Sequence, residues 1–178
     1  MGVPGTHTVA VGDKITAADE NTYGRDATTW FLSPARVAVT HSTTQSIPNA
    51  TFTAHLFDTE TFDTDTTGDH SVSSATSKFT VLTPGTYLLS GAVAFAGNAT
   101  GRRGGAFYKN GSILTGSEWL VPAGVASSLI IPSMAFMVQV VASDQLEMYV
   151  FQDSGGALNA NPGSGAASSF QALWVGTP

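Results

Sequence analysis

Apolar and polar residues alternate with a period of two through most of the chain after Ser33, and turn residues close each run. This alternation is typical of β-strands that place one face on a core. The pattern predicts strands over residues 36–40, 50–56, 78–82, 86–95, 105–109, 128–141, 145–151 and 168–175. We therefore predict an all-β chain, a jelly-roll sandwich of about eight to ten antiparallel strands.

The turn signals between these runs set the connections. Asn110-Gly111 predicts a tight hairpin over residues 107–114, because both residues tolerate the positive φ values of a two-residue turn. Three stretches rich in small and polar residues, 58–77, 117–127 and 155–168, are predicted to be loops. Recognition sites are expected there, since loops carry much of the binding function of β-sandwiches.

Several predicted strands are apolar on both faces. One face of a strand fills the sandwich core, and the second is expected to pack on another surface, because a large apolar area in water is costly. The predicted oligomer interface consists of Met137, Val141, Tyr149, Phe151 and Leu173. A closed homo-oligomer is the preferred interpretation. The alternative is that residues 1–33 or the 58–77 loop cover this face within one protomer.

Residues 1–33 form a separate N-terminal arm, and residues 34–178 form the sandwich. Thr16 to Asp19 reads as a capping box that opens one short helix, predicted from Ala17 to about Thr29 because Pro34 disfavours helix just before it. The apolar residues of the arm are too few to form a core of their own. The arm therefore packs on the sandwich or docks on another protein, and docking is preferred. The expected docking residues are Val11, Ile15, Tyr23, Trp30 and Phe31.

Composition narrows the function. The chain has no cysteine, 11% charged residues and a net charge of -6. Seven Lys and Arg residues cannot form a basic stripe, so nucleic acid is not an expected partner. Neither a membrane-spanning run nor a signal-peptide pattern is present, so we expect no membrane partner and no secretory export.

Candidate chemistry is sparse. The four histidines show no metal-ligand spacing and are expected to be structural or solvated. Residues 58–69 carry a group of acids that resembles the start of a calcium loop at Asp63, but Ser74 stands where a closing Glu is needed. An acid- and hydroxyl-rich loop is preferred, and calcium binding stays open. No nucleophile motif is present, so we predict no catalytic residues, no cofactor, no metal and no enzymatic activity.

Arg102, Arg103 and Trp119 form the candidate ligand site. The two arginines, among glycines, are expected at a cationic loop tip that is either a solvated turn or an anion site. Trp119 lies in a polar stretch, where it either binds a ligand, by stacking on a sugar or anchoring a protein partner, or is buried under its own loop.

The run Phe79-Thr80-Val81-Leu82-Thr83-Pro84-Gly85-Thr86-Tyr87 resembles the signature strand pair of the tumour-necrosis-factor-like superfamily, which includes the globular heads of complement proteins. Residues 107–111, 140–146 and 169–173 resemble its central hairpin, the turn before its penultimate strand, and its closing strand. Ser143 departs from the glycine usual in that turn. The resemblance implies a jelly-roll homotrimer with apolar side chains along its three-fold axis.

The arm segment Gly12-Asp13-Lys14-Ile15-Thr16-Ala17 is similar to the opening of many bacteriophage tail, baseplate and fibre proteins. The two resemblances together imply a non-enzymatic virion structural protein of minor-tail or fibre type, exposed on the phage particle and contacting the host surface. Its expected partners are itself, other virion proteins and a host cell-surface glycan. A capsid decoration or head-fibre protein is the alternative, and a cellular adhesin or signalling ligand is a third.

Overall fold

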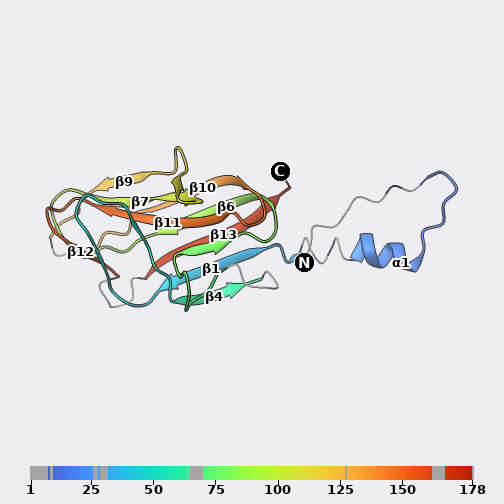
Figure 1. Cartoon of the computed structure of the whole chain (residues 1–178), viewed down its shortest axis with the longest axis horizontal. Helices are drawn as coiled ribbons and strands as arrows, with labels where there is room; N and C mark the ends of the chain where they lie inside the picture. The colour runs from blue at the N-terminus through green and yellow to red at the C-terminus, as the bar shows by residue number, and fades with distance from the viewer. Residues whose placement is uncertain are drawn as a thin grey trace.

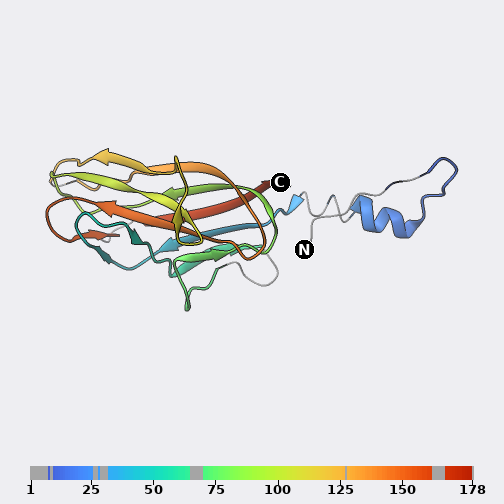
Figure 2. The same ribbon diagram turned by 45° about the horizontal axis from the view of Figure 1, so that its top comes forward.

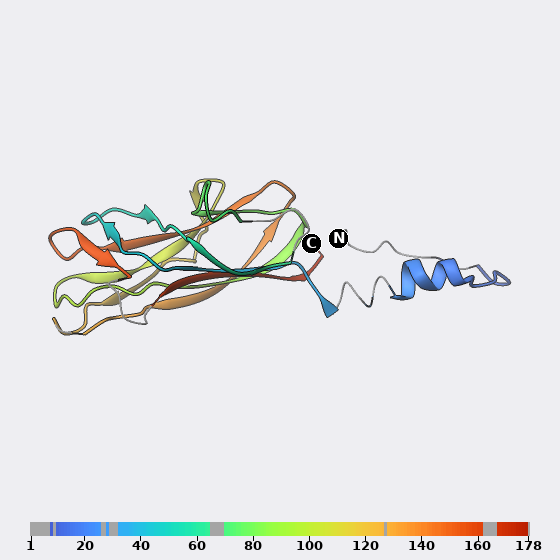
Figure 3. The same cartoon turned by 90° about the horizontal axis from the view of Figure 1, so that it is seen from below.

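Strand pairing arranges the chain in two antiparallel sheets packed face to face (Figure 1). The structure is a computed structural model that describes residues 8, 10–25, 28, 32–64, 70–126, 128–161 and 167–177. The strands run along the length of the body, and the two sheets form its layers (Figure 2 and Figure 3). The prediction of an all-β jelly-roll sandwich is confirmed.

One layer is a five-stranded sheet in the order β10-β6-β13-β1-β4. Its strands are β1 (Arg36–His41), β4 (Thr59–Asp63), β6 (Gly85–Ala92), β10 (Ser133–Val140) and β13 (Ser168–Gly176). Arg36 pairs with Leu173, so β1 begins and β13 ends at the same end of the sandwich. The arm leaves the body at this end (Figure 1).

The other layer is a six-stranded sheet built on two long strands, β7 (Arg102–Lys109) and β11 (Gln145–Gln152). Its short strands are β3 (Thr53–Ala54), β5 (Lys78–Thr80), β8 (Ser112–Ile113) and β9 (Trp119–Pro122). Strands β3 and β5 share the free edge of β11, while β8 and β9 share that of β7. A small sheet pairs β2 (Gln45–Ile47) with β12 (Leu158–Ala160).

The core lies between the two layers and centres on Phe170 of β13. Its ring stacks on Phe79 and Phe107, with centroid distances of 4.4 and 5.5 Å, and lies 5.9 Å from that of Phe57. All four rings are essentially inaccessible to solvent. Contacts between residues far apart in sequence therefore join both layers, which is how a jelly roll becomes a single packed unit.

Six of the predicted strands appear close to their expected places, and the hairpin at Asn110-Gly111 has the predicted positive φ values of 52° and 76°. Three other predictions were wrong. The stretch 50–56 pairs only as Thr53–Ala54, the stretch 128–141 pairs as a regular strand only from Ser133, and β4, β9 and β12 lie inside the predicted loops. Strand β4 is almost entirely exposed and joins β1 at a sheet edge, where no apolar face is required.

The predicted capping box is present at the start of the arm helix. The Asp19 backbone N–H donates to Thr16 Oγ1 (3.2 Å), and the Thr16 N–H donates to Asp19 Oδ2 (2.8 Å). The predicted uniform α-helix is wrong: α1 spans Ala17–Asp19, and a π-helical segment, η1, follows over Glu20–Arg25. Asn, Thr, Tyr and Gly are weak helix formers, which accounts for this loosening. In the described part of the chain, no helix could cross a membrane.

Candidate functional site

The five predicted interface residues belong to opposite surfaces of the sandwich. Met137 and Leu173 lie on β10 and β13 of the five-stranded sheet, and Val141 directly follows β10. Tyr149 and Phe151 lie on β11 of the six-stranded sheet. The prediction of one shared interface is therefore corrected. Each sheet buries its inner face, so strands with two apolar faces in different sheets direct their outer residues away from each other.

The outer face of the five-stranded sheet carries a stripe of aliphatic side chains. Met137 pairs with Leu88, and Leu88 pairs with Leu173, so these three form a row across β10, β6 and β13. Met137 is 59% exposed, Val141 62% and Leu173 37%. We name this surface the aliphatic stripe; it consists of Leu88, Met137, Val141, Leu173 and Val175.

The aliphatic stripe is not covered by the described parts of the arm or of the 58–77 segment. Met137 and Val141 stay mostly exposed. Strand β4 from that segment lies beside β1 at the edge of the sheet rather than over it. For the described residues, the alternative of cover within one protomer is wrong.

The outer face of the six-stranded sheet carries aromatic rings instead. Tyr108 stacks on Tyr149 with a centroid distance of 3.9 Å, and Phe52 lies 5.0 Å from Phe151 and 6.3 Å from Tyr108. All four are half-buried. We name this surface the aromatic cluster; it consists of Phe52, Tyr108, Tyr149 and Phe151.

Arg102 and Arg103 do not form a cationic loop tip, because both lie in β7 and their side chains point to opposite faces. Arg102 is exposed and binds Asp153 through Nε and Nη2, each 3.0 Å from Oδ2. Arg103 is fully buried and donates to the backbone oxygens of Arg102 (2.8 Å) and Asn98 (3.4 Å). Burial lowers the pKa of Arg103, and Asp153 opposes that shift. The expectation of a cationic loop tip, either a solvated turn or an anion site, is therefore wrong.

Trp119 is buried, which decides between its two interpretations. It begins β9, and its ring lies 5.2 Å from Phe107 in the core. Gly105 on β7 permits this position, because a Cβ there would lie 3.1 Å from the Trp119 ring and 2.3 Å from the Tyr149 carbonyl oxygen. Trp119 is thus a core residue, and the expectation that it contacts a ligand is wrong.

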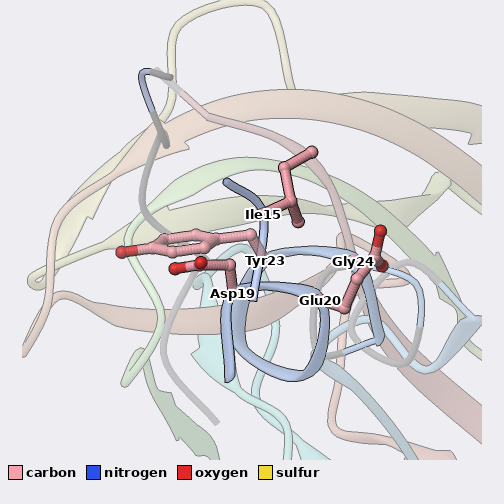
Figure 4. Close-up of a pocket in the computed structure, with 5 residues that line it drawn as sticks. All are labelled: Ile15, Asp19, Glu20, Tyr23 and Gly24. Carbon is pink, nitrogen blue, oxygen red and sulfur yellow. The ribbon is translucent and has the colours of Figure 1, made fainter. Parts of the chain in front are cut away.

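The arm presents its apolar side chains to solvent. Val11 is fully exposed, Ile15 is 62% exposed and Tyr23 is 37% exposed. Ile15 and Tyr23 lie beside Asp19, Glu20 and Gly24 around a hollow of about 130 Å³ on the helix (Figure 4). The other two expected docking residues, Trp30 and Phe31, lie outside the described residues.

The acids of the 58–77 segment are partly engaged by the fold. The Ser42 backbone N–H and hydroxyl and the Thr43 hydroxyl donate to the Asp58 carboxylate at 2.8 to 3.1 Å. Burial alone would raise the pKa of Asp58, but these hydrogen bonds and one from Thr59 outweigh it and lower the pKa to about 2. Asp63 accepts from the His70 N–H (3.3 Å). Asp65 and Asp69 lie outside the described residues, and among those described no group of three or more His or acidic side chains could hold a metal.

Three histidines are buried, as the structural interpretation predicted. His55 lies between the rings of His41 (5.1 Å) and Phe57 (5.2 Å), and neither of its ring nitrogens has a partner among the described residues. Burial, with a smaller contribution from His41, lowers the pKa of His55 to about 3, against the opposing effect of Asp58. A neutral imidazole at this position is therefore part of the core.

Among the described histidines, only His41 lies close to both a side-chain hydroxyl and a carboxylate. Its Nε2 lies 2.8 Å from Thr43 Oγ1, which donates to Asp58 Oδ2 at 3.1 Å. The hydroxyl therefore stands between the imidazole and the carboxylate, whereas nucleophilic catalysis needs the imidazole between the other two. This arrangement supports the turn after β1 rather than acyl transfer.

The comparisons with known proteins concern the fold. No family model matches the chain, and no curated protein matches it significantly in sequence. Solved structures do match. The globular domain of zebrafish complement 1qA has a TM-score of 0.53 at 12% identity, covering 81% of this chain and 99% of that domain. Murine APRIL at pH 8.5 has 0.55 at 12%, covering 79% and 99%, and the Eiger TNF of S. frugiperda has 0.54 at 10%, covering 81% and 94%. The chain has the jelly-roll fold of TNF and C1q domains.

Proposed function

We propose that the chain is a non-enzymatic structural protein of a bacteriophage particle, a homotrimeric head of minor-tail or fibre type held by its N-terminal arm. The observation that carries the proposal is the pairing of two exposed apolar surfaces on separate parts of the molecule. The aliphatic stripe lies on the sandwich, and Val11, Ile15 and Tyr23 lie on the arm. Each surface has a different role.

The aliphatic stripe serves self-association. Its central row is formed by Met137, Leu88 and Leu173, none of which is charged. The next residue across the sheet, paired with Leu173, is Arg36 on β1. Burying such side chains contributes about 25 cal/mol per Å², which supports a closed assembly. Three copies related by an axis along the sandwich would all release their arms at one end, because β1 begins at the same end in each copy.

The arm serves attachment to the particle. Its helix lies clear of the sandwich in all views (Figures 1 to 3), and the side chains of Val11 and Ile15 are exposed to solvent, which suits them to contact a neighbouring protein. The segment Gly12 to Ala17, which resembles the opening of phage tail and fibre proteins, lies in this arm. Three arms on one trimer would multiply weak contacts through their shared effective concentration.

Immunogold labelling of phage particles tests the placement. Labelling at the tail is the expected result, and labelling over the capsid would replace tail location with a decoration role. A double variant, Ile15→Asp with Tyr23→Asp, is expected to leave the sandwich trimeric in solution while the protein is lost from particles. Retention of this variant at wild-type copy number would contradict arm-mediated attachment.

A further inference from the structure

The aromatic cluster is a second outward surface that the proposed trimer does not use. Tyr149 and Phe151 pair with Ala106 and Gly104 on β7. These small partners leave room for both rings to lean over β7, where Tyr149 stacks on Tyr108 and Phe151 lies beneath the Arg102 guanidinium at 5.9 Å. The rings therefore form a continuous platform rather than isolated side chains.

Polar groups without intramolecular partners lie within this platform. Among the described residues, neither the Tyr108 nor the Tyr149 hydroxyl takes part in a hydrogen bond, whereas the buried Tyr87 hydroxyl donates to Thr83 O at 2.9 Å. Each free phenol lies within the electrostatic influence of a carboxylate, Glu118 for Tyr108 and Glu147 for Tyr149. Burial and these carboxylates raise the pKa of both phenols, so both keep their protons as hydrogen-bond donors.

The charges around the platform do not favour an anionic ligand. Arg102 at its edge is already paired with Asp153 at 3.0 Å. Lys78, which faces Glu147 across β5 and β11, donates to Gln145 Oε1 at 2.9 Å. Glu118 is exposed, and Glu147 is buried and accepts from the Ser77 hydroxyl at 3.0 Å. Stacking on nucleic-acid bases would require free cations for the phosphates, and this surface offers acids instead.

We propose that the aromatic cluster binds a neutral carbohydrate. A pyranose ring presents an apolar C–H face surrounded by hydroxyls. The ring faces of Tyr108, Tyr149 and Phe151 can pack against the apolar C–H face of the sugar. The phenol hydroxyls and the nearby Glu118 carboxylate can hydrogen-bond to the sugar hydroxyls. A second copy of the chain is the less suited occupant, because these rings are half-buried already while the aliphatic stripe is more exposed. This site deepens the proposed host contact, but its binding chemistry does not depend on particle attachment.

Isothermal titration of the full chain tests the proposal. The probes are maltohexaose, cellohexaose, chitohexaose and a galactan as neutral sugars, with oligogalacturonate as the acidic comparison. At least one neutral sugar is expected to bind, and the acidic one is not. Tyr149→Ala is expected to weaken that binding by about tenfold or more, and Tyr149→Phe by about threefold, because the ring and its hydroxyl contribute separately.

Matched variants separate this site from the fold and from the trimer. Met137→Ser on the opposite sheet is expected to leave the affinity per protomer unchanged. The second site variant, Tyr108→Phe, keeps both rings and tests the hydroxyl without loss of packing. Absence of binding by all four neutral sugars overturns the proposal, as does equal affinity of Tyr149→Ala and wild type. If the wild-type chain forms an assembly larger than a trimer and Tyr149→Ala dissociates that assembly, the aromatic cluster is a protein interface. This result also overturns the carbohydrate proposal. Labelling of particles is unaffected by these outcomes, so the two proposals fail separately.

Discussion

The two outer faces of the sandwich differ in chemistry although both belong to antiparallel sheets of the same core. The five-stranded sheet presents aliphatic side chains, of which Met137 and Val141 are more than half exposed. The six-stranded sheet presents aromatic rings that contact one another, and two of them carry phenol hydroxyls without a hydrogen-bond partner in the described part of the chain. An exposed aliphatic surface gains from complete burial, whereas a self-packed aromatic surface with polar edges tolerates water.

This difference teaches that an apolar outward residue is not by itself an interface residue. Leu173 and Phe151 read alike in sequence, each as an apolar residue on the second face of a strand. Their surroundings separate them: Leu173 lies in a row with Leu88, while Phe151 pairs with Gly104 and lies under Arg102. We therefore assign self-association to the first face and ligand binding to the second as proposals that mutation can separate.

The largest expected effect comes from a charge in the aliphatic stripe. Leu173→Asp is expected to convert the proposed trimer to monomers, because each copy would bury an unpaired carboxylate at a cost of about 3 kcal/mol. Sedimentation at micromolar concentration measures the change. Tyr149→Ala on the opposite face is the control and should remain trimeric. A Leu173→Asp chain that still sediments as a trimer would show that this face is not the interface.

Acid is expected to have the next largest effect. The folded pKa of His55 is about 3, below the ordinary value of 6.5, so the unfolded chain binds more protons between these values. Stability is therefore highest above pH 6.5 and falls as the pH drops toward 3, by on the order of 4 kcal/mol. Asp58 weakens the fold further as the pH falls from 3.8 through about 2.

Denaturant unfolding at a series of pH values measures this loss. Because the His55 ring contacts His41 of β1 and its backbone N–H donates to Met148 O of β11 (2.9 Å), acid should weaken both sheets together rather than one outer face first. His55→Phe is expected to flatten the pH dependence between 6.5 and 3. Titration of the His55 ring by NMR in the wild type is the check that needs no substitution, and a pKa near 6.5 there would contradict the explanation.

The smallest effect concerns the turn that joins the two faces, between β10 and β11. Ser143 has a φ of 75°, and the turn is held by hydrogen bonds from Val141 N (2.9 Å) and Asn110 Nδ2 (2.7 Å) to the Asp144 carboxylate. Ser143→Gly is expected to stabilise the chain by about 0.5 to 1 kcal/mol, because glycine adopts this conformation without strain. Thermal unfolding measures the gain. A lower melting temperature would show that the Ser143 side chain stabilises the turn by more than its positive φ destabilises it.

Sequence periodicity was most reliable where a strand has a buried inner face. The alternation in Ser168–Gly176 and Gln145–Gln152 predicted both strands to within one residue, since every second side chain must enter the core. It failed for Thr59–Asp63, whose residues are polar and exposed, because an edge strand is held by backbone hydrogen bonds that leave no apolar pattern. Turn chemistry succeeded at Asn110-Gly111, where positive φ values are required locally.

For the candidate site residues, too, local sequence patterns failed where the position depends on distant parts of the chain. Arg103 and Trp119 stand among glycines and polar residues, which read as a loop, yet both are buried on β7 and β9. The signal that could have placed them is Gly104-Gly105, since small residues on one strand make room for a large ring on its neighbour. The aromatic cluster was missed because Phe52 and Tyr108 are distant in sequence from Tyr149 and Phe151.

The sequence by itself determined the fold class, the helix cap at Thr16 and the presence of surplus apolar surface, because each depends on the spacing of residue types along a short segment. Only the tertiary structure decided which surplus residues share a surface. The sheet to which a strand belongs depends on its pairing with strands distant in sequence. Pairing of β10, β6 and β13 brings Met137, Leu88 and Leu173 together. Pairing of β11 and β7 brings Tyr149 and Tyr108 together. Long-range strand order is set by the packing of the whole core, which no local pattern specifies.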